Sequence, residues 1–138
     1  MSVGSHQALK NYQRVGAVAA VSAADPHRLV QLMLENVLQR IAAARGHMAR
    51  REVASKGEQV SKAITVVGAL NASLNLEAGG EIAANLRVLY DYCCRRLALG
   101  NAQDDDSILE EVGTIIRRIK EGWDGIGEEA RALAKAAP

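Results

Sequence analysis

Apolar residues recur through most of the chain at intervals of three and four positions, which is the period of an α-helix. Four long stretches carry this period, and no stretch shows the strict alternation typical of a β-strand. The predicted apolar stripes are Leu29, Met33, Val37, Ile41 and Ala44; Val60, Ile64, Val67, Leu70 or Asn71, and Leu74; Ile82, Leu86, Leu89, Cys93 and Leu97; and Ile108, Val112, Ile115, Ile119, Trp123 and Ile126. The pattern predicts an all-α protein built from four long helices.

Capping signals place the starts of the first two helices. Asp25 is a good N-cap residue, and Pro26 suits the first helical position, where its missing N–H costs nothing. Ser55 and Glu58 have the Ser-x-x-Glu spacing of a capping box. We therefore expect the first helix to start at Pro26 and the second to start near residue 55.

Glycine and aspartate mark the boundaries of the last two helices. Gly79-Gly80 interrupts the helical pattern before the third stretch, and Gly100 can close that helix in a left-handed conformation. Asp104–Asp106 stand where carboxylates favour a helix N-terminus, and Ser107 with Glu110 offers a second capping box. These signals predict a third helix that opens after Gly79-Gly80 and a fourth that begins near Ser107.

Connection lengths decide how the helices pack. Connections of about four to eight residues between helices of about twenty favour antiparallel neighbours. The predicted fold is therefore an antiparallel up-down four-helix bundle with a short N-terminal helical segment. We expect a single domain over residues 1–138, with a mobile segment at 1–24, the bundle at 25–127 and a frayed tail at 128–138.

Charge and composition narrow the class of function. The chain has 138 residues and a net charge of +1, so no strong field steers it toward nucleic acid. No run approaches the roughly eighteen apolar residues of a membrane helix, so we expect no membrane insertion. Cys93 and Cys94 are too close in sequence to staple a fold, and the apolar run Val15–Ala24 contains no Leu and makes a poor signal peptide. We therefore expect a cytosolic protein with reduced cysteines.

The side chains that could carry chemistry are scattered. His6, His27 and His47 lie in different segments without a metal-ligand spacing, and Cys93 falls on a predicted core stripe with no histidine base close in sequence. No glycine-rich phosphate loop is present. We therefore expect no metal, no cofactor and no enzymatic activity. A histidine phosphotransfer bundle remains an alternative, although His47 lies near a helix end and not in the middle of a helix.

Several helices carry more apolar surface than one inner seam requires. Examples are Val66, Val67, Leu70 and Leu74, and Leu86, Val88, Leu89, Tyr90 and Tyr92. The excess predicts either a dimer seam or a groove for a partner helix. A helical interaction module is the expected class, with a homodimeric adaptor without a client as one form of it.

Short motifs spread from about Tyr12 to Trp123 resemble, in order and spacing, the FliS family of flagellar secretion chaperones. The motifs are Ser55-Lys56-Gly57-Glu58, Ser61-Lys62-Ala63-Ile64, Leu70-Asn71-Ala72-Ser73-Leu74, Gly79-Gly80-Glu81-Ile82-Ala83-Ala84-Asn85-Leu86, Leu89-Tyr90-Asp91-Tyr92, Arg95-Arg96-Leu97 and Ile108-Leu109-Glu110-Glu111-Val112. The block from Gly79 to Leu97 is the most specific part.

The resemblance implies a cytosolic helical bundle that binds the disordered C-terminal segment of flagellin. Such a chaperone keeps flagellin from polymerising early and delivers it to the flagellar type III export apparatus. Flagellin is therefore the expected partner, with the export gate and flagellar regulators as further candidates. A segment that is disordered alone and apolar on one face once helical suits a groove between helices.

The resemblance and the apolar pattern together give a set of candidate groove residues. They are Tyr12, Val66, Leu70, Leu74, Leu86, Leu89 and Tyr90. Tyr12-Gln13 matches the family's N-terminal tyrosine motif, and we expect Tyr12 to cover the groove when no client is bound. Leu34-Glu35-Asn36 stands where the family has aromatic-Asp-Gly, which alters the expected groove shape. Periodicity places these residues to within about one position, so their division between core and groove stays open.

Overall fold

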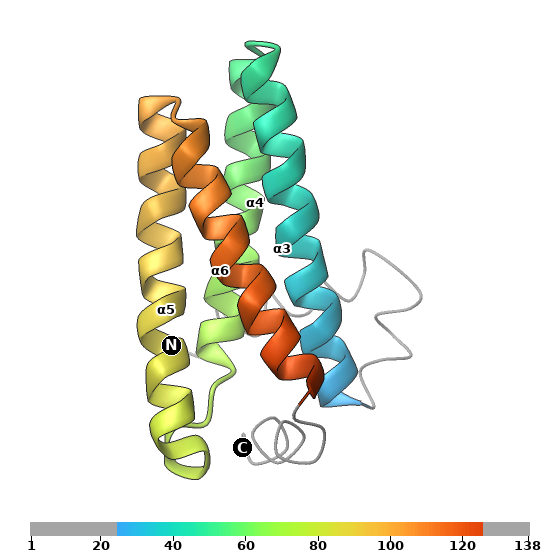
Figure 1. Cartoon of the computed structure of the whole chain (residues 1–138), viewed down its shortest axis with the longest axis vertical. Coiled ribbons are helices and arrows are strands. Elements are labelled where there is room, and N and C mark those ends of the chain that lie inside the picture. Colours follow the sequence, from blue (N-terminus) through green and yellow to red (C-terminus); the bar gives the residue numbers. More distant parts are fainter. Residues whose placement is uncertain (1–24, 126–138) are drawn as a thin grey trace.

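The computed structural model describes residues 25–125, which form four α-helices (Figure 1). The helices are α3 (Pro26–Ala49), α4 (Val53–Ala72), α5 (Leu76–Gln103) and α6 (Asp106–Gly125). Consecutive helices pack antiparallel, and no strand occurs in this part of the chain, which confirms the predicted fold class. The expectations for residues 1–24, including the short N-terminal helical segment, and for 126–138, including Ile126, lie outside the described residues.

The four helices close into a ring. α3 packs against α4 and α6, and α5 packs against α4 and α6, while no Cα atoms of the diagonal pairs come within 8 Å of each other in residues 25–125. In Figure 1, α6 begins beside the end of α5 and leans across the bundle, so that it ends beside the start of α3. The seam between α5 and α6 therefore widens from the start of α6 toward its end.

The core lies inside this ring and is almost entirely aliphatic. Its buried members are Met33, Leu34, Val37, Ile41 and Ala44 on α3; Val60, Ala63, Val67, Ala69 and Leu70 on α4; Tyr90, Cys93 and Leu97 on α5; and Leu109, Val112, Ile116 and Trp123 on α6. Most of the predicted stripes on α3, α4 and α6 are thus confirmed. None of the described helices is long and apolar enough to cross a membrane.

The predicted stripe on α5 is wrong at two positions. Ile82 is 55% exposed and Leu89 is 37% exposed, although both were expected in the core. Cys93 and Leu97 are buried as predicted, and the inward stripe also contains Ala83 and Tyr90, which repeat every seven residues with Leu97. Two adjacent apolar stripes run along this helix, and the period alone does not tell which one faces inward.

The start of α3 agrees with the sequence. Pro26 is the first helical residue, and the Asp25 carboxylate accepts the backbone N–H groups of His27 at 3.1 Å and Arg28 at 3.4 Å. These N–H groups have no partner within the helix, so the cap satisfies donors that would otherwise depend on water.

The start of α4 corrects the predicted capping box. Its N-cap is Glu52, so Ser55 lies within the first turn of the helix. The Glu52 N–H donates to the His47 carbonyl at 2.9 Å, so a tight turn brings the chain directly from α3 into α4. Glu58 does not reach back to Ser55 but pairs with Lys62, one turn further along, at 2.9 Å.

Lys56 joins the start of α4 to the end of α5. Its side chain is only 5% exposed, and its ammonium group donates to the Asn101 carbonyl at 3.0 Å and to the Asp104 carboxylate at 2.6 Å. The positive charge therefore sits at the C-terminal, negative end of the α5 dipole.

The break predicted at Gly79-Gly80 is a kink inside α5 and not its start. The helix begins at Leu76, where the Asn75 side chain accepts the Ala78 N–H at 3.0 Å. Gly80 has φ 54° and ψ −130°, a conformation that is open in practice to glycine alone. The kink sits just before the exposed apolar stripe of α5.

Gly100 does not close α5 as predicted. The helix runs on to Gln103, and Asp104 takes the left-handed conformation with φ 56°. Gly100 lies where α6 comes closest, since a Cβ atom there would lie 3.0 Å from side-chain atoms of Ile108 and Leu109. Its small size permits the close approach of the two helices.

The start of α6 also corrects a predicted capping box. Asp105 caps the helix by accepting the Ser107 N–H at 3.0 Å and the Ser107 hydroxyl at 2.6 Å. Asp106 instead forms a two-pronged ion pair with Arg45, at 2.7 and 3.0 Å, and Glu110 lies 3.6 Å from the same guanidinium. These acidic residues therefore tie α6 to the end of α3.

Candidate binding groove

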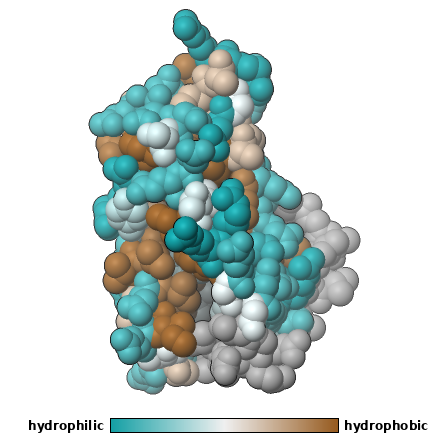
Figure 2. Space-filling model, in the orientation of Figure 1, coloured by the Kyte–Doolittle hydropathy of each residue, from teal (hydrophilic) through white to brown (hydrophobic). Residues whose placement is uncertain are grey.

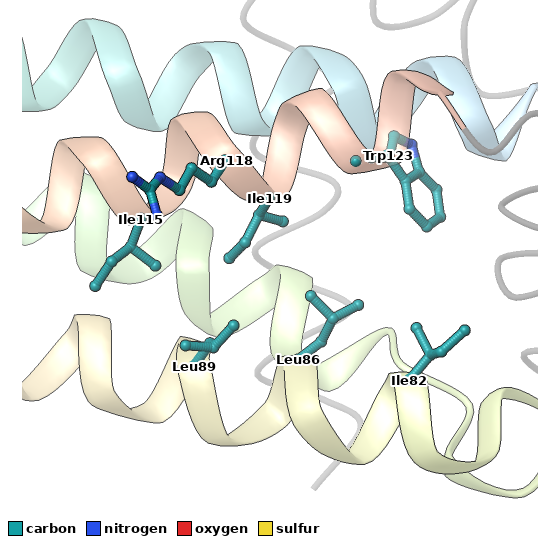
Figure 3. Close-up of a pocket in the computed structure, with 8 residues that line it drawn as sticks. Ile82, Leu86, Leu89, Ile115, Arg118, Ile119 and Trp123 are labelled. Carbon is teal, nitrogen blue, oxygen red and sulfur yellow. The ribbon is translucent and has the colours of Figure 1, made fainter.

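A groove of about 520 Å³ follows the widening seam between α5 and α6 (Figure 3). The α5–α6 groove is lined by Ile82, Leu86, Leu89, Ile115, Arg118, Ile119, Gly122 and Trp123. All but one of the side chains that line it are uncharged, and Figure 3 shows two apolar rows that face each other across the opening.

The α5 row is the exposed stripe that follows the Gly80 kink. Ile82, Leu86 and Leu89 are spaced by four and three residues, so one face of the helix carries all three. Leu86 is half-buried and packs against the core, while Ile82 and Leu89 stand more open to solvent. This row offers contact area that no described part of the chain covers fully.

The α6 row sits on the opposite wall. Ile115 and Ile119 are half-buried and pack against the core, and Trp123 is 8% exposed at the far end of the row. Figure 3 shows Trp123 at the same end of the groove as Ile82. Packing against the core therefore holds both walls of the groove in place.

Trp123 is held in place by His27 at the start of α3. The Trp123 indole N–H donates to the His27 carbonyl at 3.0 Å, and the His27 Nε2 donates to the Trp123 carbonyl at 2.9 Å. The two rings also stack, with centroids 5.2 Å apart and planes 16° apart. These contacts hold the end of α6 against α3. The end of α6 is therefore separated from α5, and the groove lies between them.

Arg118 is the only charged residue among those that line the groove, and it is exposed. No ion pair joins it to another side chain within residues 25–125. The groove is therefore an apolar channel with one unpaired positive charge at its rim.

The narrow end of the seam is closed by a polar cluster. Glu111 accepts the Tyr92 hydroxyl at 2.6 Å and the Arg96 guanidinium at 2.9 Å, and these bonds hold its pKa below the ordinary value. The same carboxylate raises the pKa of Tyr92. The cluster ties α5 to α6 beyond the groove, where the helices lie close.

The surface in this region is conspicuously apolar. Figure 2 shows hydrophobic surface gathered over the lower part of α5 and along its border with α6, between polar patches. Ile82 and Leu89, which line the α5–α6 groove, are both exposed. Contiguous exposed apolar surface of this kind marks interaction sites in soluble proteins.

A second, smaller hollow lies on the other side of α5. The α4–α5 depression is lined by Gly68, Asn71, Ala72, Leu74, Leu76 and Arg87 and has a volume of about 280 Å³. Asn71 donates to Asp91 at 2.8 Å, while its buried side-chain oxygen accepts no hydrogen bond from the described residues.

A comparison with protein families matches residues 8–130 to the family described as flagellar protein FliS. The chain belongs to the FliS family. The resemblance inferred from the motifs is thereby confirmed, and the match covers the whole bundle together with both walls of the α5–α6 groove.

Curated relatives carry the same name. The chain is 46% identical over 120 residues to flagellar secretion chaperone FliSB of Pseudomonas aeruginosa, covering 87% of this chain and 95% of that relative. It is 38% identical over 123 residues to flagellar secretion chaperone FliS of Salmonella typhimurium, covering 88% and 91%. It is 34% identical over 128 residues to the FliS of Vibrio cholerae, covering 93% and 94%. The FliS family is one of chaperones and not of enzymes.

The structure distributes the candidate residues derived from the sequence over several places. Leu86 and Leu89 line the α5–α6 groove, and Leu74 lines the α4–α5 depression. Val66 is half-buried on α4 and packs against the core. Leu70 and Tyr90 belong to the core itself, with 1% and 3% exposure. Tyr12 lies outside the described residues.

Sequence reasoning did not select most of the groove lining as partner-binding residues. The periodicity places Ile82, Ile115, Ile119 and Trp123 in core stripes, and it gives no binding signal for Arg118 or Gly122. A clue was available in α5, where Ile82 and Leu89 lie one position away from the Ala83 and Tyr90 stripe. Two neighbouring apolar stripes on one helix indicate that it has two partners.

The cysteines and His47 are poorly suited to chemistry. Burial raises the pKa of the Cys93 thiol to about 12, and burial also raises the pKa of Cys94, so neither thiol is a ready nucleophile. Both cysteines are free. His47 lies in the last turn of α3 with its Nδ1 2.7 Å from the Glu52 carboxylate, which is not the exposed mid-helix position that phosphotransfer requires.

Proposed function

We propose that this protein is a flagellin-specific export chaperone that binds the disordered C-terminal segment of flagellin. Binding keeps flagellin from polymerising early and assists its type III export from the cytosol. The observation that carries the proposal is membership of the FliS family over residues 8–130. The relatives with this match are named flagellar secretion chaperones.

The proposed binding site is the α5–α6 groove. A flagellin segment that forms an amphipathic helix would present apolar side chains at intervals of three and four residues. Leu86 and Leu89 on one wall, and Ile115 and Ile119 on the other, carry the same intervals, so side chains of the segment can interdigitate with both rows. The flagellin helix would take the place of a fifth neighbour in the bundle.

Tight binding of a disordered segment requires an interface longer than this groove. Ordering a disordered segment costs about 2–5 kcal/mol or more of the interaction energy. The α4–α5 depression, where Leu74 and Leu76 lie beside Asn71 and Arg87, supplies a further surface of mixed polar and apolar character. We propose that the flagellin segment continues from the groove toward this depression, while Tyr12 covers part of the same surface in the absence of flagellin.

Release of flagellin completes the proposed cycle. No nucleotide hydrolysis is needed if the export gate competes for the same apolar contacts, since the segment then passes from one surface to another. The export gate and flagellar regulators are thus proposed as further partners, with the groove as the shared surface.

A binding experiment tests the proposal. Isothermal titration with flagellin, and with flagellin that lacks its C-terminal segment, is expected to give heat only for the full-length protein. Leu89→Asp places a charge in the groove and is expected to weaken binding about tenfold or more, because a charge is costly to bury without a partner.

Val88→Asp is the matched control. Val88 neighbours Leu89 on α5, is 66% exposed and does not line the groove. Its replacement is expected to leave the affinity unchanged, and thermal melts of both variants check that the bundle is intact. Equal binding by wild type and Leu89→Asp would reject the groove, and a doubled mass without any flagellin binding would favour the homodimeric adaptor.

A further inference from the structure

Gly122 interrupts the apolar row of α6 near the Trp123 end of the groove. It follows Ile119 by three residues and so shares the face that carries Ile115 and Ile119. Apart from its two chain neighbours and the backbone of its own helix, no described residue would lie within 4 Å of a Cβ atom at Gly122. The row therefore has a gap at this position, and the backbone of α6 is open to the groove.

Helix packing gives no reason for this glycine. A glycine inside a helix destabilises it relative to alanine, and nothing in the bundle approaches Gly122 closely. Gly100 is different, because its added Cβ would lie 3.0 Å from Ile108 and Leu109. Gly100 permits the contact of two helices, whereas Gly122 leaves space that no described residue fills.

The space at Gly122 has firm walls. Trp123 stands beside it and is fixed by its two hydrogen bonds and ring stacking with His27. Ile119 bounds it one turn earlier on α6, and Ile82 lies across the groove at the same end as Trp123 (Figure 3). The boundary is therefore apolar and, on the Trp123 side, rigid.

We propose that the gap at Gly122 is a notch that receives one large apolar side chain of the flagellin segment. The inference rests on the proposed function and deepens it, because it fixes where along the groove the segment sits. The bare backbone at Gly122 forms the floor of the notch and Trp123 forms its end wall. A small or charged side chain in this register leaves the notch empty or buries a charge, so the notch selects both the residue and the register.

The test fills the notch without disturbing the core. Gly122→Leu adds a good helix former in open space, so thermal stability is expected to stay the same or rise, while affinity for a flagellin C-terminal peptide is expected to fall about tenfold or more. Gly125→Leu is the matched control, since Gly125 lies on the same helix, has nothing within 4 Å and does not line the groove. Its affinity is expected to stay at the wild-type value.

A double-mutant cycle identifies the side chain that enters the notch. Each large apolar residue of the peptide is replaced by alanine in turn and titrated against wild type and Gly122→Leu. One replacement is expected to weaken binding to wild type and to have little effect on binding to Gly122→Leu. Wild-type affinity of Gly122→Leu for the peptide would overturn the notch. If Leu89→Asp still weakens binding in that case, the groove stands and the notch alone is wrong; if it does not, both are wrong.

Discussion

At the first turn of α3, His27 makes contacts that determine the shape of a surface on another helix. Its ring stacks on Trp123 and its Nε2 donates to the Trp123 carbonyl, and both residues are less than a tenth exposed. His27 therefore holds Trp123, near the end of α6, against the start of α3.

Removing the His27 ring is expected to loosen the end of α6. In His27→Ala the Trp123 carbonyl loses its donor and the indole loses its stacking partner, so the free energy of unfolding is expected to fall by about 2 kcal/mol. Trp123 is the only tryptophan, so its fluorescence emission is expected to shift toward longer wavelength as water reaches the ring.

A conservative variant separates the hydrogen bond from the stacking. His27→Gln keeps a side-chain N–H donor and is expected to recover part of the lost stability in denaturant unfolding. An unchanged emission spectrum and unchanged stability in His27→Ala would show that Trp123 is held by the rest of α6 and not by His27.

At the scale of single helices, the sequence predicts that each helix exists more reliably than it predicts where the helix begins or which face points into the core. The start of α3 follows directly from Asp25 and Pro26, since both act locally. The Ser55 and Ser107 capping boxes do not form, because α4 already begins after Glu52 and Asp105 caps α6. Several polar residues lie near the start of each of these helices. The path of the preceding turn selects the one at the N-cap, and tertiary contacts set that path.

The sequence is also limited in predicting which residues line the groove. Leu86 and Leu89 were selected from the sequence as partner-binding residues, and both line the groove. Tyr90 was selected too, but its ring is turned into the core, one stripe away on the same helix. Adjacent stripes of α5 are both apolar, so only the lean of α6 toward α3 decides which stripe is covered.

Close approach of α5 and α6 gives a prediction for helix packing. Gly100→Ala places a Cβ 3.0 Å from Ile108 and Leu109, and overpacking of this kind costs about 1–3 kcal/mol. We expect this overpacking cost to offset or exceed the roughly 1 kcal/mol by which alanine stabilises a helix relative to glycine. Gly68→Ala, at an open position on α4, is expected to keep that gain.

Denaturant unfolding of the two variants checks this difference. Gly68→Ala is expected to be more stable than wild type, and Gly100→Ala less stable than Gly68→Ala by more than about 1 kcal/mol. Equal stabilisation by both substitutions would show that α6 can move away from α5 without cost.

At the scale of the whole molecule, ion pairs connect neighbouring helices of the ring. Hydrogen bonding to Arg45 lowers the pKa of Asp106 from its ordinary 3.8, and this pair joins α3 to α6. Hydrogen bonds from Tyr92 and Arg96 lower the pKa of Glu111 from 4.5, and this cluster joins α5 to α6. Each carboxylate is thus more acidic in the folded protein than in the unfolded chain.

Acid is therefore expected to destabilise the bundle. A carboxylate whose pKa is depressed by folding stabilises the protein above its unfolded pKa, and this contribution disappears as the pH falls through the folded pKa. The melting temperature is expected to be steady near neutral pH and to fall progressively below about pH 4.5, the ordinary value for Glu111.

Single substitutions identify the groups responsible for the acid response. Asp106→Asn is expected to lower the melting temperature slightly at neutral pH and to make it less sensitive to acid, since the exposed pair contributes little on its own. A melting temperature that falls equally steeply in wild type, Asp106→Asn and Glu111→Gln would mean that other carboxylates control the response.

The ring as a whole explains why a small bundle has a groove at all. α5 and α6 are tied together at the start of α6 by Glu111, and α6 is tied to α3 at its end by Trp123. Between these two points the helices diverge, and apolar side chains remain half-covered along the opening (Figure 1). The surface offered to flagellin is thus a consequence of how the bundle closes.

Amide hydrogen exchange on the complex tests this account most directly. Adding the flagellin C-terminal segment is expected to slow exchange in residues 82–89 and 115–123, which carry the two walls of the groove, and to leave the buried middle of α3 at residues 34–44 unchanged. If the complex forms while exchange in both walls stays as it is in the free protein, the α5–α6 groove does not hold flagellin.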